Sequence, residues 1–328
     1  MRIGLIGAGM AGLSCAIALR DRGHDTVSFD KGRGPGGRMS TRRIETPSGA
    51  IAFDHGAQYF TARDPGFVAQ VEDWAHDGHV ARWPGGGGEA WVGTPAMNAP
   101  VRAMAAAADV DWAVQVQSLS HDGMWHISGI RTASRASAAH PAENPDPVPS
   151  AFDAGPFDAL VLAVPAEQVA PLIEPQDRAI ADLARSIQSD PCWTVMVAFD
   201  ERIPVDRDRL TDIGIIGSAV RNSSKPGRTA AEAWVLQASA EWSRDQLESD
   251  PDSVARALIA AFEAVIGTPL PAIVTSNAHR WRYAKSGNAR QDAIWRPDSR
   301  LGVCGDWLLG PRIEAAWLSG RRLADLIG

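Results

Sequence analysis

The sequence predicts an α/β protein, and three features at the two ends of the chain carry this prediction. Near the N-terminus, two short apolar runs at 3–6 and 26–29 flank a segment with helical spacing of apolar residues. A glycine-rich turn joins the first run to that helix. Near the C-terminus, a further apolar run at 301–304 precedes a helical pattern over 311–327. Strand–helix–strand order predicts a parallel sheet, here built from both ends of the chain.

The turn after the first run has the spacing G-x-G-x-x-G, formed by Gly7, Gly9 and Gly12, and the second run ends at Asp30. Gly7 permits the tight turn, Gly9 lets backbone amides approach a pyrophosphate, and Gly12 lets the helix pack closely on the strand. The helix N-terminus attracts the phosphate charge. In this context the motif predicts a Rossmann-type dinucleotide site, with a purely structural glycine turn as the alternative.

The residues that follow Asp30 do not predict a second regular helix. Between positions 31 and 43 lie four glycines, one proline and five basic residues. Glycine and proline at this density disfavour a helix. One interpretation is a second phosphate-binding segment, in which Gly36 and Gly37 allow close approach and Arg38 supplies a charged fork. The alternative is a solvated, flexible basic loop.

The C-terminal run ends in Gly305 and Asp306, and Pro311 suits the first turn of the helix after it. A Gly-Asp pair alone is a common turn. Together with the two N-terminal segments it indicates a third part of the same dinucleotide site.

Composition excludes several classes of function. The chain has 328 residues and a net charge of −7, which gives no reason to expect nucleic-acid or membrane partners. No run of 18 apolar residues occurs, so no membrane span is expected. The three cysteines are scattered, which predicts reduced thiols and a cytoplasmic protein. Ligand spacings typical of metal sites are absent, so no metal is expected. Oligomeric state is left undetermined.

Between its two ends the chain alternates strands and helices, with no internal repeat. A polar stretch at 133–155, rich in Pro, Ala and Ser, is expected to be a mobile loop. The predicted strands are 50–61, 112–118, 124–131, 158–164, 193–199, 213–219, 233–238 and 273–281. The predicted helices are 66–78, 97–107, the helices between 165 and about 188, and 253–266.

Three segments resemble the bacterial renalase-like flavoproteins. They are 31–63 (KGRGPGGRMSTRR to FDHGAQYFTAR), 279–284 (HRWRYA) and 305–320 (GDW to EAAWLSG). The Gly-Gly-Arg element also resembles the wider amine-oxidase-type flavoproteins. The resemblance implies a p-hydroxybenzoate-hydroxylase-like fold, in which an α+β substrate domain is inserted into a Rossmann-type domain that binds FAD non-covalently. The expected FAD-binding domain comprises 1–65, 95–185 and 285–328, and the expected substrate domain comprises 66–94 and 186–284.

The resemblance also implies roles for individual residues. Asp30 would bind the adenosine ribose, Asp306 the ribityl chain, and the segment 55–58 would run beside the isoalloxazine ring. The predicted cofactor-binding positions are Gly7, Gly9, Met10, Ala11, Gly12, Asp30, Lys31, Gly37, Arg38, Met39, His55, Gly56, Ala57, Gln58, Asp306, Ile313 and Glu314. The side chains of Met10, Met39 and Met97 are expected to contribute packing.

The candidate catalytic residues are Gln58, His279, Trp281 and Tyr283. Trp281 and Tyr283 alternate on one predicted strand and would share a face, which suits a flat wall over a planar substrate. The implied reaction is oxidation of the 2- and 6-dihydro isomers of NAD(P)H to NAD(P)+, with O2 reduced to hydrogen peroxide. A dihydropyridine needs no base, so a wall or structural role is favoured for His279 over a general base. Another amine-oxidase-type oxidoreductase and a flavin-binding redox sensor stay open as alternatives.

Overall fold

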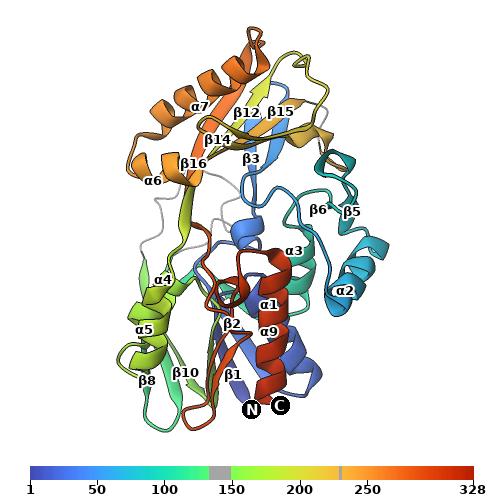
Figure 1. Ribbon diagram of the computed structural model, residues 1–328. Helices are drawn as coiled ribbons and strands as arrows, with labels where there is room; N and C mark the ends of the chain where they lie inside the picture. The colour runs from blue at the N-terminus through green and yellow to red at the C-terminus, as the bar shows by residue number, and fades with distance from the viewer. Residues whose placement is uncertain (133–148, 229–230) are drawn as a thin grey trace. The chain divides into compact units, whose positions relative to one another are not determined.

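The computed structural model describes residues 1–132, 149–228 and 231–328 (Figure 1). The expected mobile loop at 133–155 falls mostly outside these residues. Its described end, 150–155, lies in strand β10 (Ser150–Phe157), so the loop prediction is wrong there. The rings of Phe152 and Phe157 pack against the ring of Phe29. This packing explains why the segment forms a strand although most of the predicted loop is polar.

Contacts divide the chain into two compact units. The first unit comprises 1–37, 101–188 and 286–328, and the second comprises 38–100 and 189–285. The division differs from the expected ranges mainly at 38–65, which packs with the second unit. Apolar residues Ile51 and Phe53 explain the difference, because they share a core with Met196 and Val235 of the second unit.

A six-stranded sheet forms the centre of the first unit, and its mainly parallel character confirms the prediction. Five of its strands are parallel, and β17 pairs with β18 in the antiparallel direction at one edge. In spatial order the strands are β17 (Ile294–Arg296), β18 (Leu301–Val303), β11 (Ala159–Leu162), β1 (Arg2–Ile6), β2 (Asp25–Asp30) and β7 (Val110–Trp112). The N-terminal and C-terminal segments therefore belong to one sheet.

Two helices from opposite ends of the chain pack together on this sheet (Figure 1). Helix α1 (Met10–Asp21) contacts α9 (Ile313–Ile327) so closely that a Cβ on Gly320 would lie 2.2 Å from the carbonyl oxygen of Ala11. Ser14 also donates a hydrogen bond to the Trp317 carbonyl. The expected helix at 311–327 begins two residues later, at Ile313, and a short helix α8 (Asp306–Leu309) precedes it.

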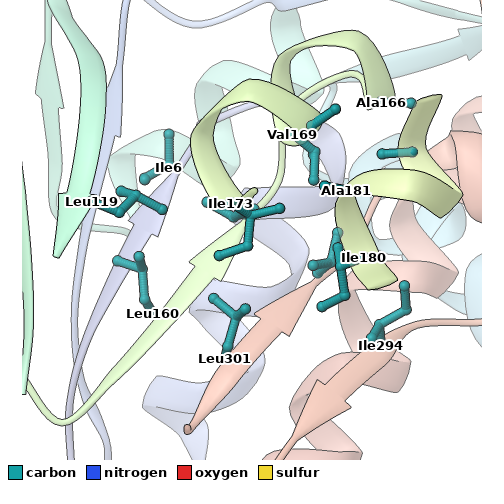
Figure 2. Close-up of a cluster of buried hydrophobic side chains, with 14 of the residues drawn as sticks. Ile6, Leu119, Leu160, Ala166, Val169, Ile173, Ile180, Ala181, Ile294 and Leu301 are labelled. Atoms are coloured by element: carbon teal, nitrogen blue, oxygen red, sulfur yellow. The ribbon is translucent and has the colours of Figure 1, made fainter. Parts of the chain in front are cut away.

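The other face of the sheet is covered by α4 (Ala166–Ile173) and α5 (Arg178–Ser186). Figure 2 shows Ile6, Leu160 and Leu301 of three neighbouring strands directed toward side chains of these helices. This apolar cluster also includes Leu119 from a separate antiparallel sheet. That sheet has the order β10–β9–β8, with β9 at Trp125–Arg131 and β8 at Val114–His121.

One predicted strand, 112–118, is divided between two sheets. Val110–Trp112 pairs with β2 of the six-stranded sheet, whereas Val114–His121 pairs with β9. Ala113 separates them and adopts a positive φ of 61°. This backbone conformation interrupts an extended strand, and nothing in the side-chain pattern indicates it.

The second unit is built on a five-stranded antiparallel sheet covered on one face by helix α7 (Pro251–Ile266). The predicted strand 213–219 is confirmed in part, because it covers most of β14 but also the turn at Gly214 and the last residue of β13. In spatial order the strands are β13 (Arg209–Ile213), β14 (Ile216–Arg221), β15 (Glu232–Ala238), β12 (Asp190–Phe199) and β16 (Ile273–Lys285).

A two-stranded hairpin lies on the opposite face of this sheet. It consists of β3 (Thr41–Thr46) and β4 (Gly49–Asp54), and its apolar residues Ile51 and Phe53 pack on β12 and β15. The second unit also contains α2 (Pro65–His76) and α6 (Ala240–Asp245), and α6 precedes α7 in the chain. Helix α3 (Ala99–Ala106) begins in the second unit, but its residues from 101 onward belong to the first. Strands β5 (Val80–Arg82) and β6 (Trp91–Gly93) form a small separate hairpin.

Candidate active site

In the first unit, the glycine turn has the geometry of a phosphate-binding loop. A Cβ on Gly12 would lie 1.9 Å from the Gly7 carbonyl oxygen, so only glycine permits this helix–turn contact. A Cβ on Gly9 would instead meet nothing within 4 Å, so this side of the turn is open. Helix α1 has no side-chain cap and no acidic residue in its first turn, which leaves its N-terminal dipole available to an anion.

Asp30 lies at the end of β2 beside this turn and orders the backbone around it. One carboxylate oxygen accepts from the Ala8 amide and the other from the Gly32 amide, both at 2.7 Å. The residue is half-buried, so the carboxylate keeps acceptor capacity for a ligand hydroxyl. The neighbouring Lys31 side chain is exposed and donates to Gln168 at 3.2 Å.

The C-terminal segment brings a buried carboxylate to the same unit. Gly305 donates its amide to Ser319 Oγ at 3.0 Å, which fixes the turn after β18. Asp306 follows and is 5% exposed. Glu314, in the first turn of α9, is also buried and accepts from Arg312 at 3.4 Å. Ile313 is half-buried, and the first-turn residues Met10 and Ala11 of α1 are buried.

The basic stretch 31–43 contains no α-helix, as predicted, but it includes a short 3₁₀ turn (Gly37–Met39), and its last three residues begin β3. Gly37 has a positive φ of 51°. Gly37 is the last residue of the first unit, and Arg38 and Met39 belong to the second. Met39 is buried, in line with its predicted packing role.

In the second unit, the segment 55–58 follows β4 and is almost entirely buried. A Cβ on Gly56 would lie 2.0 Å from the Arg38 carbonyl oxygen, and the Ala57 amide donates to that same oxygen at 2.8 Å. Gln58 Nε2 donates to the carbonyls of Asp54 and Gly56, and Gln237 also donates to Gly56. The segment is therefore held by its own backbone and by the sheet below it.

A buried ionic cluster fixes the start of this segment. Asp54 is 0% exposed and accepts from Lys225 Nζ at 3.1 Å and from Arg228 at 2.5 Å. It also accepts from Thr41 Oγ1 and the Met97 amide. Lys225 in turn donates to Gln58 Oε1 at 3.1 Å, which sets the direction of the Gln58 amide. Sequence reasoning missed Lys225 and Arg228, because their partner Asp54 lies far away in the chain.

Burial and charge act in opposite directions on this cluster. Burial alone would raise the pKa of Asp54, but Lys225 and Arg228 lower it to about 2. Burial lowers the pKa of Lys225 to about 8, because the desolvation cost and the nearby Arg228 outweigh the attraction of Asp54. With both cations charged, one carboxylate faces two positive groups, so the cluster has a net positive charge.

Three of the predicted residues form a corner of aromatic rings, named here the ring corner: His55, His279 and Trp281. The His55 ring stacks on Trp281 with centroids 5.1 Å apart, and His279 lies edge-on to both rings at 4.9 and 4.6 Å. Trp281 Nε1 donates to the His55 carbonyl at 2.8 Å. His55 Nδ1 is buried without a hydrogen-bond partner of ordinary geometry.

Both histidines of the ring corner are held in the neutral form. Desolvation, together with the charges of His279 and Arg42, lowers the pKa of His55 to about 4. Desolvation and Arg42 also lower the pKa of His279. A lowered pKa makes each imidazole a weaker base than an ordinary histidine.

Tyr283 lies outside the ring corner, although it was expected beside Trp281. The pairing of β16 with β12 shifts register between Asp190 and Cys192, opposite the stretch from Trp281 to Lys285. Such an irregularity interrupts the alternation of faces that the sequence argument assumed. Tyr283 is half-buried and makes no ring contact with the other three residues. Its place in the site stays a prediction.

Comparison with known proteins identifies the family. Residues 5–72 match the model of an NAD(P)-binding Rossmann-like domain. Residues 75–328, more than half of the chain, match the model of the flavin-containing amine oxidoreductases. The chain belongs to the flavin-containing amine oxidoreductase family.

Solved structures agree with this family at the level of the fold. A putative protoporphyrinogen oxidase from Exiguobacterium sp. 255-15 is 10% identical, with a TM-score of 0.71 and coverage of 99% of this chain and 98% of the other. Cyclohexylamine oxidase from Brevibacterium oxydans IH-35A is 12% identical, with a TM-score of 0.68 over the same shares of the two chains.

A flavin-containing amine oxidoreductase uses FAD, and the residues of the first unit fit that cofactor. The open face at Gly9, the uncapped start of α1 and the carboxylate of Asp30 match a pyrophosphate and a ribose. Within the described part of the chain, no group of three His, Cys, Asp or Glu residues is arranged to hold a metal ion. No helix among those same residues is long and apolar enough to cross a membrane.

Two glycine substitutions separate folding from cofactor binding. Gly12→Ala should destabilise the protein by about 1–3 kcal/mol or more, because the new methyl group overlaps the Gly7 carbonyl. Gly9→Ala should keep the apoprotein melting temperature but lower the FAD-to-protein ratio, because its methyl group occupies the open face. Thermal melts and flavin absorbance measure the two effects. Gly88→Ala, also in open space, is the control, and full FAD content in Gly9→Ala would contradict the assignment.

Removing the Asp54 charge should strongly destabilise the second unit. Asp54→Asn leaves Lys225 and Arg228 buried without a counter-charge, which typically costs about 3–5 kcal/mol. Asp190→Asn is the matched control, because its pair with Arg244 is roughly half-exposed and should contribute less than about 1 kcal/mol. Urea unfolding at pH 7 compares the two.

The same group predicts a pH dependence. The pKa of Asp54 is about 2 in the folded protein and near 3.8 when unfolded, so its contribution is complete above pH 4. That contribution is lost as the pH falls from about 4 toward 2. Asp54→Asn should therefore show a shallower acid dependence of unfolding free energy than the unaltered protein. Equal slopes in this range would show that Asp54 is not ion-paired.

Proposed function

We propose that this protein is an FAD-dependent oxidase of the 2- and 6-dihydro isomers of NAD(P)H, with NAD(P)+ and hydrogen peroxide as products. The observation that carries the proposal is the ring corner. It offers a flat aromatic wall and two neutral, weakly basic histidines, which suits a planar hydride donor. The resemblance of 31–63 and 279–284 to renalase-like flavoproteins supports the same substrate.

Bound FAD would supply a hydride acceptor at its N5 atom and a route for electrons to O2. We assign its dinucleotide portion to Gly7–Gly12, Asp30 and Lys31, and its ribityl and ring contacts to Asp306, Ile313 and Glu314. The backbone of 37–39 and the segment 55–58 complete the proposed set. In this assignment Lys225 acts through Gln58, because it fixes the amide that holds the Asp54 and Gly56 carbonyls.

The protein's part in this reaction is orientation. The ring nitrogen of a 2- or 6-dihydronicotinamide itself drives the hydride out, so no side chain has to remove a proton. Trp281 and His55 would provide a surface against which the substrate ring stacks. In this proposal the protein accelerates hydride transfer by holding the reacting carbon of the substrate close to the N5 atom of FAD.

Oxidation of an amine is the second candidate function. The family match and the fold shared with cyclohexylamine oxidase favour it. An ammonium substrate would gain most from a carboxylate or from a basic group that removes its proton. The carboxylate beside the ring corner, Asp54, is already paired with Lys225 and Arg228. The two histidines there are weakly basic, so the ring corner favours the first candidate.

Anaerobic stopped-flow mixing distinguishes the two candidates. The purified holoenzyme is mixed with 2-dihydro-NAD(P), 6-dihydro-NAD(P), ordinary 4-dihydro-NADH or cyclohexylamine, and flavin bleaching is followed. We expect both isomers to reduce the flavin rapidly. Ordinary NADH should be about a hundredfold slower or worse, since a small displacement of the reacting carbon has that effect. Faster bleaching by cyclohexylamine would overturn the proposal in favour of an amine oxidase.

Variants of the ring corner test the assigned roles. Trp281→Ala should slow flavin reduction by the preferred isomer while FAD content stays near that of the unaltered protein. His279→Ala should change the rate by much less than about a hundredfold, which is the usual effect of losing an acid–base group. A hundredfold loss in His279→Ala, with normal FAD content, would instead identify His279 as a base.

A further inference from the structure

Arg42 occupies an unusual position beside the ring corner. On the hairpin of β3 and β4, Arg42 pairs with Phe53 and Ile44 pairs with Ile51. Phe53 and Ile51 pack on the five-stranded sheet, and directly paired residues share a face. Arg42 therefore leaves the hairpin on the face that contacts the sheet, whereas Arg43 leaves it on the other face.

The Arg42 guanidinium is oriented but not neutralised. Its Nη1 donates to Asn277 Oδ1 of the edge strand β16 at 2.9 Å. Within 1–132, 149–228 and 231–328, no carboxylate forms an ion pair with Arg42. Other arginines of this unit do have such partners: Arg228 pairs with Asp54, and Arg280 and Arg282 both pair with Glu248. One amide contact leaves most of the five guanidinium donors for a ligand.

The positive charge of Arg42 acts on the ring corner. Its hydrogen-bond partner Asn277 lies two residues before His279 on β16, which places the guanidinium near the ring corner. Burial lowers the pKa of both His55 and His279, and the charge of Arg42 lowers it further. Besides burial, His55 is affected by His279, Arg42, the already paired Asp54 and the Phe53 backbone, whereas His279 is affected by Arg42. A planar aromatic wall with an unpaired cation at its edge suits a flat ring that carries an anionic group.

We propose that Arg42 is an anion-binding residue of the substrate site and binds a phosphate of the dinucleotide substrate. Asn277 holds the guanidinium in place, and His279 and Trp281 lie beside the substrate ring. The identity of the substrate rests on the proposed function above, whereas the anion-binding role of Arg42 does not. Because arginine binds phosphate through a planar fork, lysine would replace it only in part.

Steady-state kinetics with two substrates tests this role. 6-Dihydro-NAD carries the pyrophosphate, and 6-dihydronicotinamide riboside lacks it. Arg42→Ala should raise KM for the dinucleotide about 10- to 100-fold, the effect of losing a charge-assisted hydrogen bond. KM for the riboside and kcat for both should stay unchanged, and Arg42→Lys should lie between. Arg43→Ala, on the other face of the same strand, is the matched control and should leave both KM values unchanged.

Three outcomes would overturn the proposal, two of them kinetic. An equal rise of KM for the riboside would mean that Arg42 supports the ring corner rather than an anion. Unchanged KM for the dinucleotide would mean that Arg42 contacts no phosphate of it. A fall in FAD content of Arg42→Ala would assign the residue to the cofactor instead.

An NMR titration of the holoenzyme tests the anion site without turnover. Inorganic pyrophosphate should raise the pKa of His279, because a bound anion offsets the charge of Arg42. Arg42→Ala should raise that pKa without any ligand and abolish the response to pyrophosphate. No response in the unaltered protein would overturn the proposal. If neither dihydro compound reduces the flavin, the proposed function fails, and this titration still decides the role of Arg42.

Discussion

The buried carboxylate of Asp54 is the interaction on which the second unit's site depends. It lies at the end of β4, is fully buried, and accepts from Thr41, the Met97 amide, Lys225 and Arg228. These partners come from three separate segments of the chain. A buried charge of this kind requires all of its partners, because each one removed leaves another group unpaired. The constraint therefore fixes the residues that follow, His55 to Gln58, in one conformation.

Lys225 links this ionic cluster to the candidate active site. The cluster has a net positive charge, and the pKa of Lys225 is lowered. Both indicate that burying the Lys225 ammonium group costs free energy rather than stabilising the fold. Lys225 also donates a hydrogen bond to Gln58 Oε1. Gln58 Nε2 in turn donates to the carbonyls of Asp54 and Gly56, so Lys225 helps to fix the conformation of this segment. The buried ionic cluster is thus connected by hydrogen bonds to the segment 55–58.

The sequence predicts the local parts of this protein well. Gly7, Gly9, Gly12 and Asp30 belong to one short unit, so their spacing alone indicates the turn and its geometry. The ion pairs of Asp54 could not be predicted, because Lys225 and Arg228 lie 171 and 174 residues away. The pairing irregularity opposite the stretch from Trp281 to Lys285 and the positive φ at Ala113 could not be predicted either. Both are backbone features that an apolar pattern does not contain.

Family membership alone does not define the substrate. The residues of the ring corner are the basis on which we propose one class of substrate over another. Burial lowers the pKa of His55 and His279, Trp281 supplies a flat surface, and Arg42 supplies a positive charge that no carboxylate in the described part of the chain pairs with. A substrate that needs a base and carries a positive charge is poorly matched by this set. A substrate that donates hydride unaided and carries phosphate is matched in each respect.

The central claim is that no side chain accepts a proton during substrate oxidation. Its most direct test is the rate constant for anaerobic flavin reduction by 6-dihydro-NAD at saturating substrate, measured from pH 5.5 to 7.5. This range lies below the titration of Lys225 near 8 and above that of His55 near 4. We expect the rate constant to be independent of pH across this range. A rate constant that decreases as the pH falls below the lowered pKa of His279, with no such decrease in His279→Ala, would contradict the claim and show that a base takes part.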